Sequence, residues 1–273
     1  MDSDRDLEIA RELHKKVVRK FEKRKIITKG IDDLWAADLL ILDKYKKENN
    51  GQKYLLVVID TFSKYLFAEP LKDKSGVIVA TAFKNILKKS KRTPKLLHVD
   101  RGKEFVNKNF EKVLDEYGIK MYHTFNEEKS SIAERVNRTL NQKFRIYFEI
   151  NKNHCWVKVL GKILKEYNEV DIHRTIGRPP ATVNESNEKE ILQRLYPLED
   201  FKRDKPVFSI GNRVRIFRKK KQFSDKYSSN WTEEIFTIKK IHLTNPITYT
   251  IQDSNNEIIL GKFYKQELQK TKF

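Results

Sequence analysis

The sequence predicts an α/β fold: a mixed five-stranded sheet with flanking helices, followed by a small C-terminal β-barrel. Between residues 31 and 184, three apolar runs of strand length come first, and later runs alternate with segments of helical periodicity. From residue 207 onward, short alternating runs follow one another between turn residues, which is typical of a barrel. A chain of 273 residues is long enough for both parts.

The first thirty residues are polar and basic, and their pattern predicts a helical N-terminal arm. Basic side chains recur through this arm: Lys15, Lys16, Arg19, Lys20, Lys23, Arg24 and Lys25. The arm lacks the apolar stretch of a signal peptide. We therefore expect residues 1–30 to form a separate basic segment.

The core, residues 31–184, is expected to contain five strands and four helices. The predicted strands span 35–42, 54–60, 65–71, 95–100 and 119–125. The predicted helices span 75–90, 108–117, 131–148 and 154–168. The short loop between the second and third strands predicts a hairpin. Helices then separate the later strands, so the sheet is expected to be mixed.

The composition changes after RPPATVN (178–184). Residues 185–206 are charged and irregular, which predicts a linker, although EKEILQRLY could add a helical turn or two. Four alternating runs follow in 207–273: FSIGNRVRIF, EEIFTIKKIH, ITYTIQD and EIILGKF. We interpret them as the strands of the barrel.

The net charge favours a polyanionic partner. Lys and Arg outnumber Asp and Glu by 57 to 38, which gives +19 and a pI near 9.7. Nucleic acid and an acidic membrane face both fit such an excess. No apolar run is long enough to cross a bilayer, so we favour nucleic acid. The alternative is a charged protein whose lysines are merely solvated.

Cysteine and histidine usage excludes several classes. Cys155 is the only cysteine, so the chain cannot form an internal disulfide, which suits a reducing compartment. The six histidines are scattered, without a close pair at metal-ligand spacing. No zinc is expected.

Three acidic residues occupy positions that indicate chemistry. Asp38 interrupts an apolar strand, where an ionised carboxylate is costly unless it is compensated. Asp100 ends the fourth predicted strand, and Glu134 opens the helix after the fifth. Carboxylates that converge at one sheet edge repel one another unless divalent cations neutralise them. Two Mg²⁺ or Mn²⁺ ions, about 4 Å apart, could there activate an oxygen nucleophile and stabilise a leaving oxygen, with Asp38 as the bridging ligand.

Each of these acids also has an ordinary structural explanation. Asp38 could face solvent, Asp100 could form a turn, and Glu134 could be a first-turn acid favoured by the helix dipole. Other carboxylates compete with them: Asp43, Asp60, Glu104, Glu127 and Glu128. Residue types and positions alone leave the choice open.

A series of motifs, in one order, carries a family resemblance. The motifs are WAADLLIL, YLLVVIDTFSKYLFAEPL, HVDRGKEF, SIAERVNRTL and YNEVDIHRTIGRPPATV. The stretch from about Asp33 to Asn184 resembles the catalytic core of retroviral-type integrases, which are DDE transposases and integrases of the RNase H-like superfamily. The 33 residues between Asp100 and Glu134 lie within the range of such integrases. Together, the ordered motifs are far more specific than any one of them.

The resemblance implies an RNase H-like fold and a polynucleotidyl transferase. It implies that Asp38, Asp100 and Glu134 are the catalytic and metal-binding acids of an enzyme that joins element 3′ ends to target DNA and can also process those ends. The lead-in ELHKKVVRKFEKRKIITKGIDDLW and the tail NWTEEIFTIKKIHLTNPITYTIQD are similar to integrases of Polinton (Maverick) transposons. A retrotransposon or a virus is the alternative source.

Two features depart from the retroviral pattern. Nothing matches the N-terminal His/Cys zinc module, and a basic arm stands at its place. The loop before the Glu usually carries a Gly, whereas this chain has Lys129, Ser130, Ser131, Ile132 and Ala133. A truncated or decayed copy is therefore an alternative to an active enzyme.

Residues near Glu134 are candidates for DNA contacts. Arg138 lies one turn after Glu134 on the same helix face, where it could reach a phosphate. Asn137 and Asn141 are weaker candidates at neighbouring positions. The alternative for Arg138 is a surface ion pair or a solvated side chain.

The C-terminal segment 206–273 is also basic, with 13 Lys and Arg against 6 Asp and Glu. Phosphate contacts are expected from the run RVRIFRKKK: Arg213, Arg215, Arg218, Lys219, Lys220 and Lys221. The aromatic residues nearby are expected in the barrel core: Phe217, Phe223, Tyr227 and Trp231. The segment resembles the SH3-like barrel at the end of many integrases. RKKK could instead be a nuclear-import signal.

Three functional hypotheses remain. The first is an integrase that acts on double-stranded DNA, as a homo-oligomer, in the nucleus if the host is eukaryotic. The second is a transposon-derived DNA-binding protein that has lost catalysis. The third is a metal-dependent nuclease, which would cut without joining. A joined product in a magnesium-dependent assay would separate the first from the others.

Overall fold

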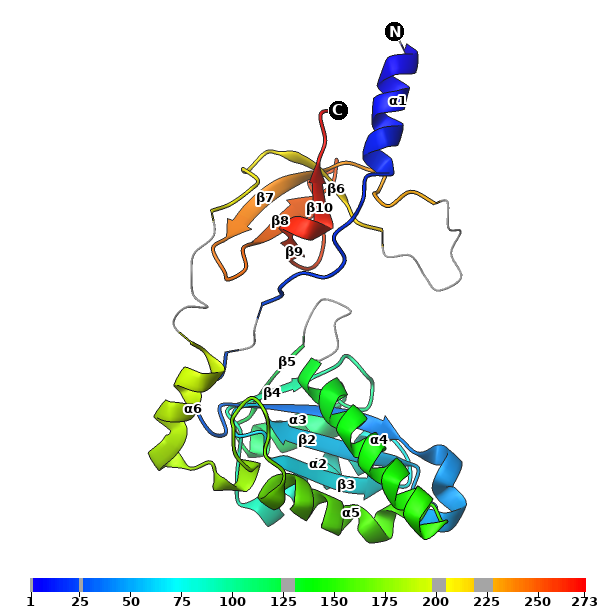
Figure 1. Ribbon diagram of the computed structural model, residues 1–273, viewed down its shortest axis with the longest axis vertical. Coiled ribbons are helices and arrows are strands. Elements are labelled where there is room, and N and C mark those ends of the chain that lie inside the picture. The colour runs from blue at the N-terminus through cyan, green and yellow to red at the C-terminus, as the bar shows by residue number, and fades with distance from the viewer. Residues whose placement is uncertain (1, 25–26, 124–130, 198–204, 219–227) are drawn as a thin grey trace. The chain divides into compact units, whose positions relative to one another are not determined.

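The computed structural model describes residues 2–24, 27–123, 131–197, 205–218 and 228–273. The chain divides into two compact units (Figure 1). One unit is Ile27–Pro197, and the other combines Met1–Ile26 with Leu198–Phe273. The N-terminal arm therefore belongs with the C-terminal sheet, although the whole core lies between them in the sequence.

The core unit is built on a mixed five-stranded sheet with the order β3-β2-β1-β4-β5. Its strands are β1 (Leu34–Ile41), β2 (Tyr54–Asp60), β3 (Leu66–Leu71), β4 (Leu96–Val99) and β5 (Lys120–His123). β1, β2 and β3 form an antiparallel meander, whereas β4 is parallel to both β1 and β5. The predicted hairpin and mixed sheet are confirmed.

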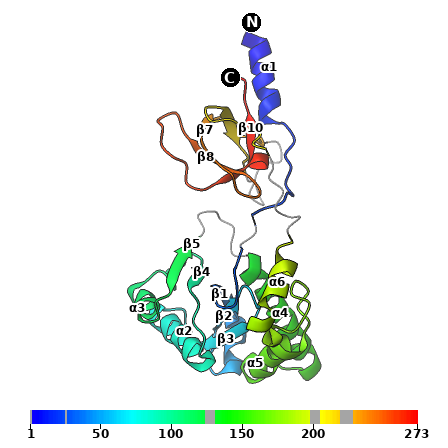
Figure 2. The same cartoon turned by 90° about the vertical axis from the view of Figure 1, so that its left-hand side faces the viewer.

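Helices cover both faces of this sheet (Figure 2). α2 (Gly76–Ser90) and α3 (Lys108–Glu116) pack on one face, and α4 (Ser131–Asn151) and α5 (Trp156–Lys165) on the other. Alternate residues of β1 belong to two different hydrophobic clusters, one on each face of the sheet. Trp35 and Ala37 belong to the cluster under α2 and α3, and Ala36 and Leu40 to the cluster under α4 and α5.

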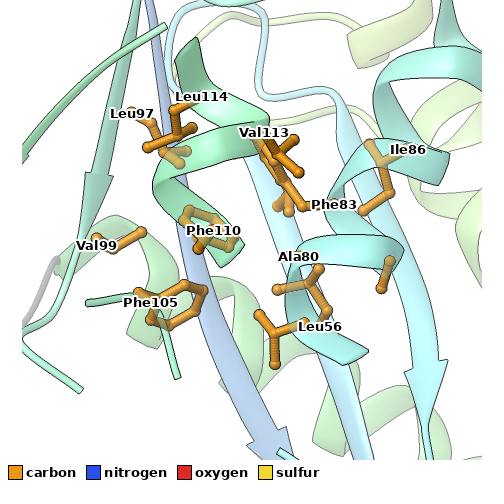
Figure 3. Close-up of a cluster of buried hydrophobic side chains, with 14 of the residues drawn as sticks. Leu56, Ala80, Phe83, Ile86, Leu97, Val99, Phe105, Phe110, Val113 and Leu114 are labelled. Carbon is orange, nitrogen blue, oxygen red and sulfur yellow. The ribbon is translucent and has the colours of Figure 1, made fainter. Parts of the chain in front are cut away.

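Aromatic rings pack against one another in the cluster under α2 and α3 (Figure 3). The Phe110 ring lies 5.3 Å from Phe83 and 5.4 Å from Phe105, and all three side chains are fully buried. Burial of each such side chain contributes about 1.5–3 kcal/mol to folding. The two helices are therefore fixed against the strand that ends at Asp100.

Part of the expected linker is a helix of the core unit. α6 (Glu188–Leu195) buries Ile191 against Phe62 and Ile176. The Glu188 carboxylate accepts a 2.8 Å hydrogen bond from the backbone amide of Ile31. The helical turns that EKEILQRLY could add are therefore present, and they pack on the core unit because Ile191 has long-range apolar partners there.

The second unit contains a five-stranded antiparallel sheet with the order β10-β6-β7-β8-β9. Its strands are β6 (Arg213–Ile216), β7 (Phe236–His242), β8 (Thr248–Gln252), β9 (Phe263–Tyr264) and β10 (Leu268–Lys270). The first three lie within expected runs. EIILGKF does not form one strand: Ile258 makes an isolated bridge, and pairing resumes at Phe263.

The N-terminal arm is helical only in its first half. α1 spans Asp2–Leu13, and residues 15–24 lack regular secondary structure. The expected helix over 1–30 is thus shortened, because the C-terminal sheet binds the backbone carbonyls that follow α1. No helix among the described residues combines the length and apolarity needed to cross a bilayer.

Candidate active site

Asp38 lies in the central strand of the core sheet. It occupies the face of β1 that carries Ala36 and Leu40, whose side chains pack under α4. Its side chain is half-buried, and Oδ1 accepts a 2.9 Å hydrogen bond from the backbone amide of Leu39. The strand thus holds a carboxylate at the border between the core and solvent.

Helix α4 contacts this carboxylate directly. Asn137 Nδ2 donates a hydrogen bond of 2.8 Å to Asp38 Oδ2. Val136 and Leu140, on either side of Asn137, are buried in the cluster that includes Ala36. Packing of the apolar stripe of α4 on the sheet therefore sets the position of the amide at Asp38.

Asp100 follows β4, the strand parallel to β1. The register pairs Trp35 with Leu97 and Ala36 with His98. The pairing ends there; Asp38 lies two residues beyond Ala36 in β1, and Asp100 lies two residues beyond His98, just after β4. Asp100 is exposed, and its Oδ1 accepts a 3.0 Å hydrogen bond from the backbone amide of Gly102.

Glu134 lies in the first turn of α4, three residues before Asn137, and is exposed. On a helix, residues three or four apart share a face, so Glu134 lies on the face that Asn137 directs to Asp38. Arg138 and Asn141 continue along this side of α4; Arg138 is exposed and Asn141 half-buried. The three predicted acids thus come from β1, the end of β4 and the start of α4.

These acids do not form a closed metal-binding cluster in this structure. Among the described residues, no group of three or more His, Cys, Asp or Glu side chains is placed to hold a metal ion. The donor types do fit a hard cation, because carboxylate oxygens are the ligands that Mg²⁺ and Mn²⁺ prefer. β1 and the residue after β4 supply two such groups, and the first turn of α4 supplies the third.

The competing acids have other surroundings. Asp60 is fully buried, and burial raises the pKa of its carboxyl. Its oxygens accept hydrogen bonds from Ser63 Oγ (2.5 Å) and Arg92 Nη2 (2.6 Å), so it is a structural ion-pair partner. Asp43 is exposed in the turn after β1. Glu127 and Glu128 lie outside the described residues.

Four basic side chains interact electrostatically near the first turn of α4, and no local sequence signal indicated them: the buried Lys64, the half-buried His173 and the exposed Arg135 and Arg174. Burial lowers the pKa of Lys64 to about 8; Asp60 opposes this shift, and Arg135 adds to it. Burial also lowers the pKa of His173 to about 4, helped by the positive charges of Lys64, Arg135 and Arg174. His173 is therefore neutral at pH 7 and adds no positive charge near α4.

The residues expected to contact DNA through the second unit differ in exposure. Arg213 and Arg218 are exposed, and Arg218 Nη1 donates to Ser229 Oγ at 3.1 Å. Arg215 is instead 2% exposed, with its guanidinium bound inside the unit, where no phosphate can approach it. Arg213 and Arg215 share one face of β6. Arg215 is buried because Glu12 of the arm and the carbonyls of Thr232 and Glu233 bind its guanidinium. Lys219, Lys220 and Lys221 lie outside the described residues.

The chain is similar to known proteins over most of its length. It is 32% identical over 233 residues to the transposon-derived protein F54H12.3 of Caenorhabditis elegans, covering 83% of this chain and 75% of that protein. The family described as the integrase core domain matches residues 30–126, a range that includes Asp38 and Asp100. This chain belongs to the family of transposon-derived integrase-core proteins.

Other relatives of this integrase-core protein are retroviral in type. The retrovirus-related Pol polyprotein from transposon 297 of Drosophila melanogaster is 25% identical over 238 residues; these cover 85% of this chain and 21% of the polyprotein. A chain of the simian T-cell lymphotropic virus intasome, solved in complex with PP2A regulatory subunit B56 gamma, superposes with a TM-score of 0.67 at 16% identity. That match covers 96% of this chain and 86% of the intasome chain. It shows the fold, which is consistent with an RNase H-like integrase core.

Proposed function

We propose that this protein is the integrase of a mobile DNA element and joins the 3′ ends of element DNA to target DNA. The hydrogen bond from Asn137 to Asp38 carries the proposal, because it ties the helix that bears Glu134 to the strand that bears Asp38. The parallel register adds Asp100 from the neighbouring strand. These residues are the acids implied by the integrase motifs.

Each residue has a defined part in the proposed reaction. Asp38, Asp100 and Glu134 would hold two divalent ions, which activate an oxygen nucleophile and stabilise the leaving oxygen when bound. Asn137 holds Asp38 in one orientation through its amide. Arg138 would bind a DNA phosphate beside the acids, with Asn141 further along α4, because both lie on the face of Glu134.

The C-terminal sheet is proposed to be an SH3-like barrel that binds duplex DNA. Its strand order and the 3₁₀ turn Lys265–Glu267 between β9 and β10 support this assignment. The exposed Arg213 and Arg218 would contact phosphates together with the run 219–221. Arg215 has no part in this surface because it is buried.

The source and setting of the protein are proposed from its motifs and relatives. The lead-in and tail sequences support a Polinton-type element, with action in the nucleus of a eukaryotic host. Assembly of several copies on DNA is proposed from the likeness to an intasome chain.

A strand-transfer assay tests the function. The full chain is incubated with candidate element-end duplexes, plasmid target and Mg²⁺, and joined product is quantified. Asp38→Asn and Glu134→Gln should abolish joining and leave DNA affinity nearly unchanged, since each removes a ligand charge at similar size. Glu111→Gln, an exposed first-turn acid of α3, is the matched control and should join normally. Full joining by Glu134→Gln would refute the assignment.

A transposon-derived DNA-binding protein without catalysis is the second candidate. The observation that favours it is that the three acids are not gathered into a metal-binding group in the described part of the chain. Tight duplex binding without joining or cutting, at any Mg²⁺ or Mn²⁺ concentration, would support this candidate. Cutting without joining would indicate a nuclease.

A further inference from the structure

The N-terminal arm is bound to the C-terminal sheet through its backbone. The carbonyl oxygen of Leu13 accepts hydrogen bonds from the backbone amides of Asn230 (2.9 Å) and Trp231 (3.2 Å). The carbonyl of Lys15 accepts a 3.0 Å hydrogen bond from Nε1 of the buried Trp231. The sheet satisfies carbonyl groups that a helix end leaves unbonded, so α1 ends here and the chain continues along the sheet.

A buried ion pair joins the same two segments. Oε2 of Glu12 lies 3.4 Å from Nε of Arg215, whose side chain is 3% exposed. Thr271 Oγ1 donates to the same Glu12 oxygen at 2.7 Å. A buried guanidinium without its carboxylate would be an uncompensated charge. The buried positive charge of Arg215 is thus neutralised only when the arm, which carries Glu12, is in place.

A second attachment lies further along the arm. The ring of Phe21 packs on Tyr264, with the centroids 5.4 Å apart. The Tyr264 hydroxyl accepts a 2.9 Å hydrogen bond from the backbone amide of Arg24. The arm is therefore attached at two places, and the backbone of Arg24, whose side chain is exposed, is held at Tyr264 of β9.

Arg24 joins a group of cations that neither segment supplies alone. Lys240 of β7 and Lys262, just before β9, are both exposed. Burial lowers the pKa of His242, and the charges of Lys262, Lys240 and Arg24, in that order, lower it further. The strand register also brings these residues together. Lys240 pairs with Thr250 of β8 and Tyr249 of β8 pairs with Phe263, which follows Lys262, while the Tyr264 hydroxyl binds the amide of Arg24. A polyanion bound across these three strands would be attracted by all three cations.

We propose that the arm and the sheet form one composite surface, made of Arg24, Lys240 and Lys262, that binds the phosphate backbone of duplex DNA. The inference rests on the proposed DNA-binding function and adds three cations that are not part of the basic run 213–221. Each cation that neutralises a phosphate releases counterions, so the surface adds affinity without sequence preference.

Charge reversal within the arm tests the proposal. Arg24→Glu is compared with Arg19→Glu, an exposed arginine of the same arm that lies outside the cation group. Binding of the full chain to a random-sequence duplex is followed by fluorescence anisotropy over a series of salt concentrations. Arg24→Glu should weaken binding about tenfold more than Arg19→Glu, and Lys240→Ala with Lys262→Ala should reduce the log–log salt slope by about two.

A third variant separates position from charge. Phe21→Ala keeps every charge but removes the ring that holds Arg24 against Tyr264. It should lose the part of the salt slope that Arg24 supplies, about one unit, with an unchanged circular dichroism spectrum. Equal losses for Arg24→Glu and Arg19→Glu would overturn the composite surface. A wild-type chain that bound no duplex would overturn the proposed function itself.

Discussion

Asn137 donates its side-chain amide to Asp38 Oδ2 at 2.8 Å, while its own Oδ1 is buried without a hydrogen-bond partner among the described residues. A buried hydrogen-bond acceptor without a partner destabilises the folded protein by about 1–3 kcal/mol. The orientation of the Asn137 amide toward Asp38 therefore has an energetic cost. The contact with Asp38 makes Asn137 a positioning residue, whereas the sequence suggested a contact with DNA.

Replacement of Asn137 should reduce catalysis more than binding. Asn137→Ala frees the Asp38 carboxylate to rotate, so we expect joining to fall about 10- to 100-fold. The Mg²⁺ concentration for half-maximal joining should rise, while duplex affinity measured by anisotropy should change little. Gln142→Ala, at an exposed position of α4, is the control and should retain most of the activity. A parallel loss of affinity and joining in Asn137→Ala would instead indicate the DNA contact.

Removal of Glu12 should destabilise the second unit. Glu12→Ala leaves the Arg215 guanidinium buried without its carboxylate, which costs about 3–5 kcal/mol. Calorimetry should show a lower Tm for this unit and an unchanged transition for the core. Glu8→Ala, which removes an exposed carboxylate of α1, is the control. Glu12→Ala combined with Arg215→Met should recover part of the loss; no recovery would contradict the ion-pair explanation.

Asn168 should stabilise the edge strand of the core sheet. Its Nδ2 donates to the carbonyl of Leu66 at 2.9 Å and its Oδ1 accepts from the Leu66 amide at 2.8 Å. Asn168→Ala leaves both buried backbone groups unsatisfied, so the free energy of unfolding should fall by about 2–5 kcal/mol. Asn151→Ala removes an exposed amide and serves as the control. Amide exchange at Leu66 that stayed as slow as in the wild type would argue against this role.

The stability of the core should rise with pH above about 8. Lys64 has a pKa of about 8 in the folded protein because it is buried, below its ordinary 10.5. Between pH 8 and 10.5, Lys64 is more protonated in the unfolded chain than in the folded protein. The free energy of unfolding therefore rises with pH across this window, by up to about 3 kcal/mol. As pH falls through 8, this contribution is lost. Urea denaturation at about pH 8 and about pH 10 measures the difference.

Variants isolate the contribution of Lys64 from that of the other lysines. Lys64→Met should flatten the pH dependence, because the group that titrates is removed. Lys162→Met, at an exposed position of α5, should leave it unchanged. Equal slopes for Lys64→Met and the wild type would show that the buried amine does not control this pH range.

The sequence by itself determined the elements of the core and the order of its acids. Apolar runs of strand length predicted β1, β2 and β3, and helical spacing predicted α2 and α4, because both patterns depend on residues close together in the chain. Asp38, Asp100 and Glu134 could be named from their places in these elements and from the integrase motifs. Their distances from one another could not.

Only the tertiary structure decided which side chains meet across long stretches of chain. The Asn137–Asp38 bond spans 99 residues, and the Arg215–Glu12 pair spans 203. Arg213 and Arg215 lie on the same face of β6, and no local pattern distinguishes them. Arg215 is buried because distant segments bind its guanidinium, and the N-terminal arm supplies its carboxylate. The arm likewise stops being helical where the sheet binds its carbonyls, and that competition between partners depends on folding, not on local propensity.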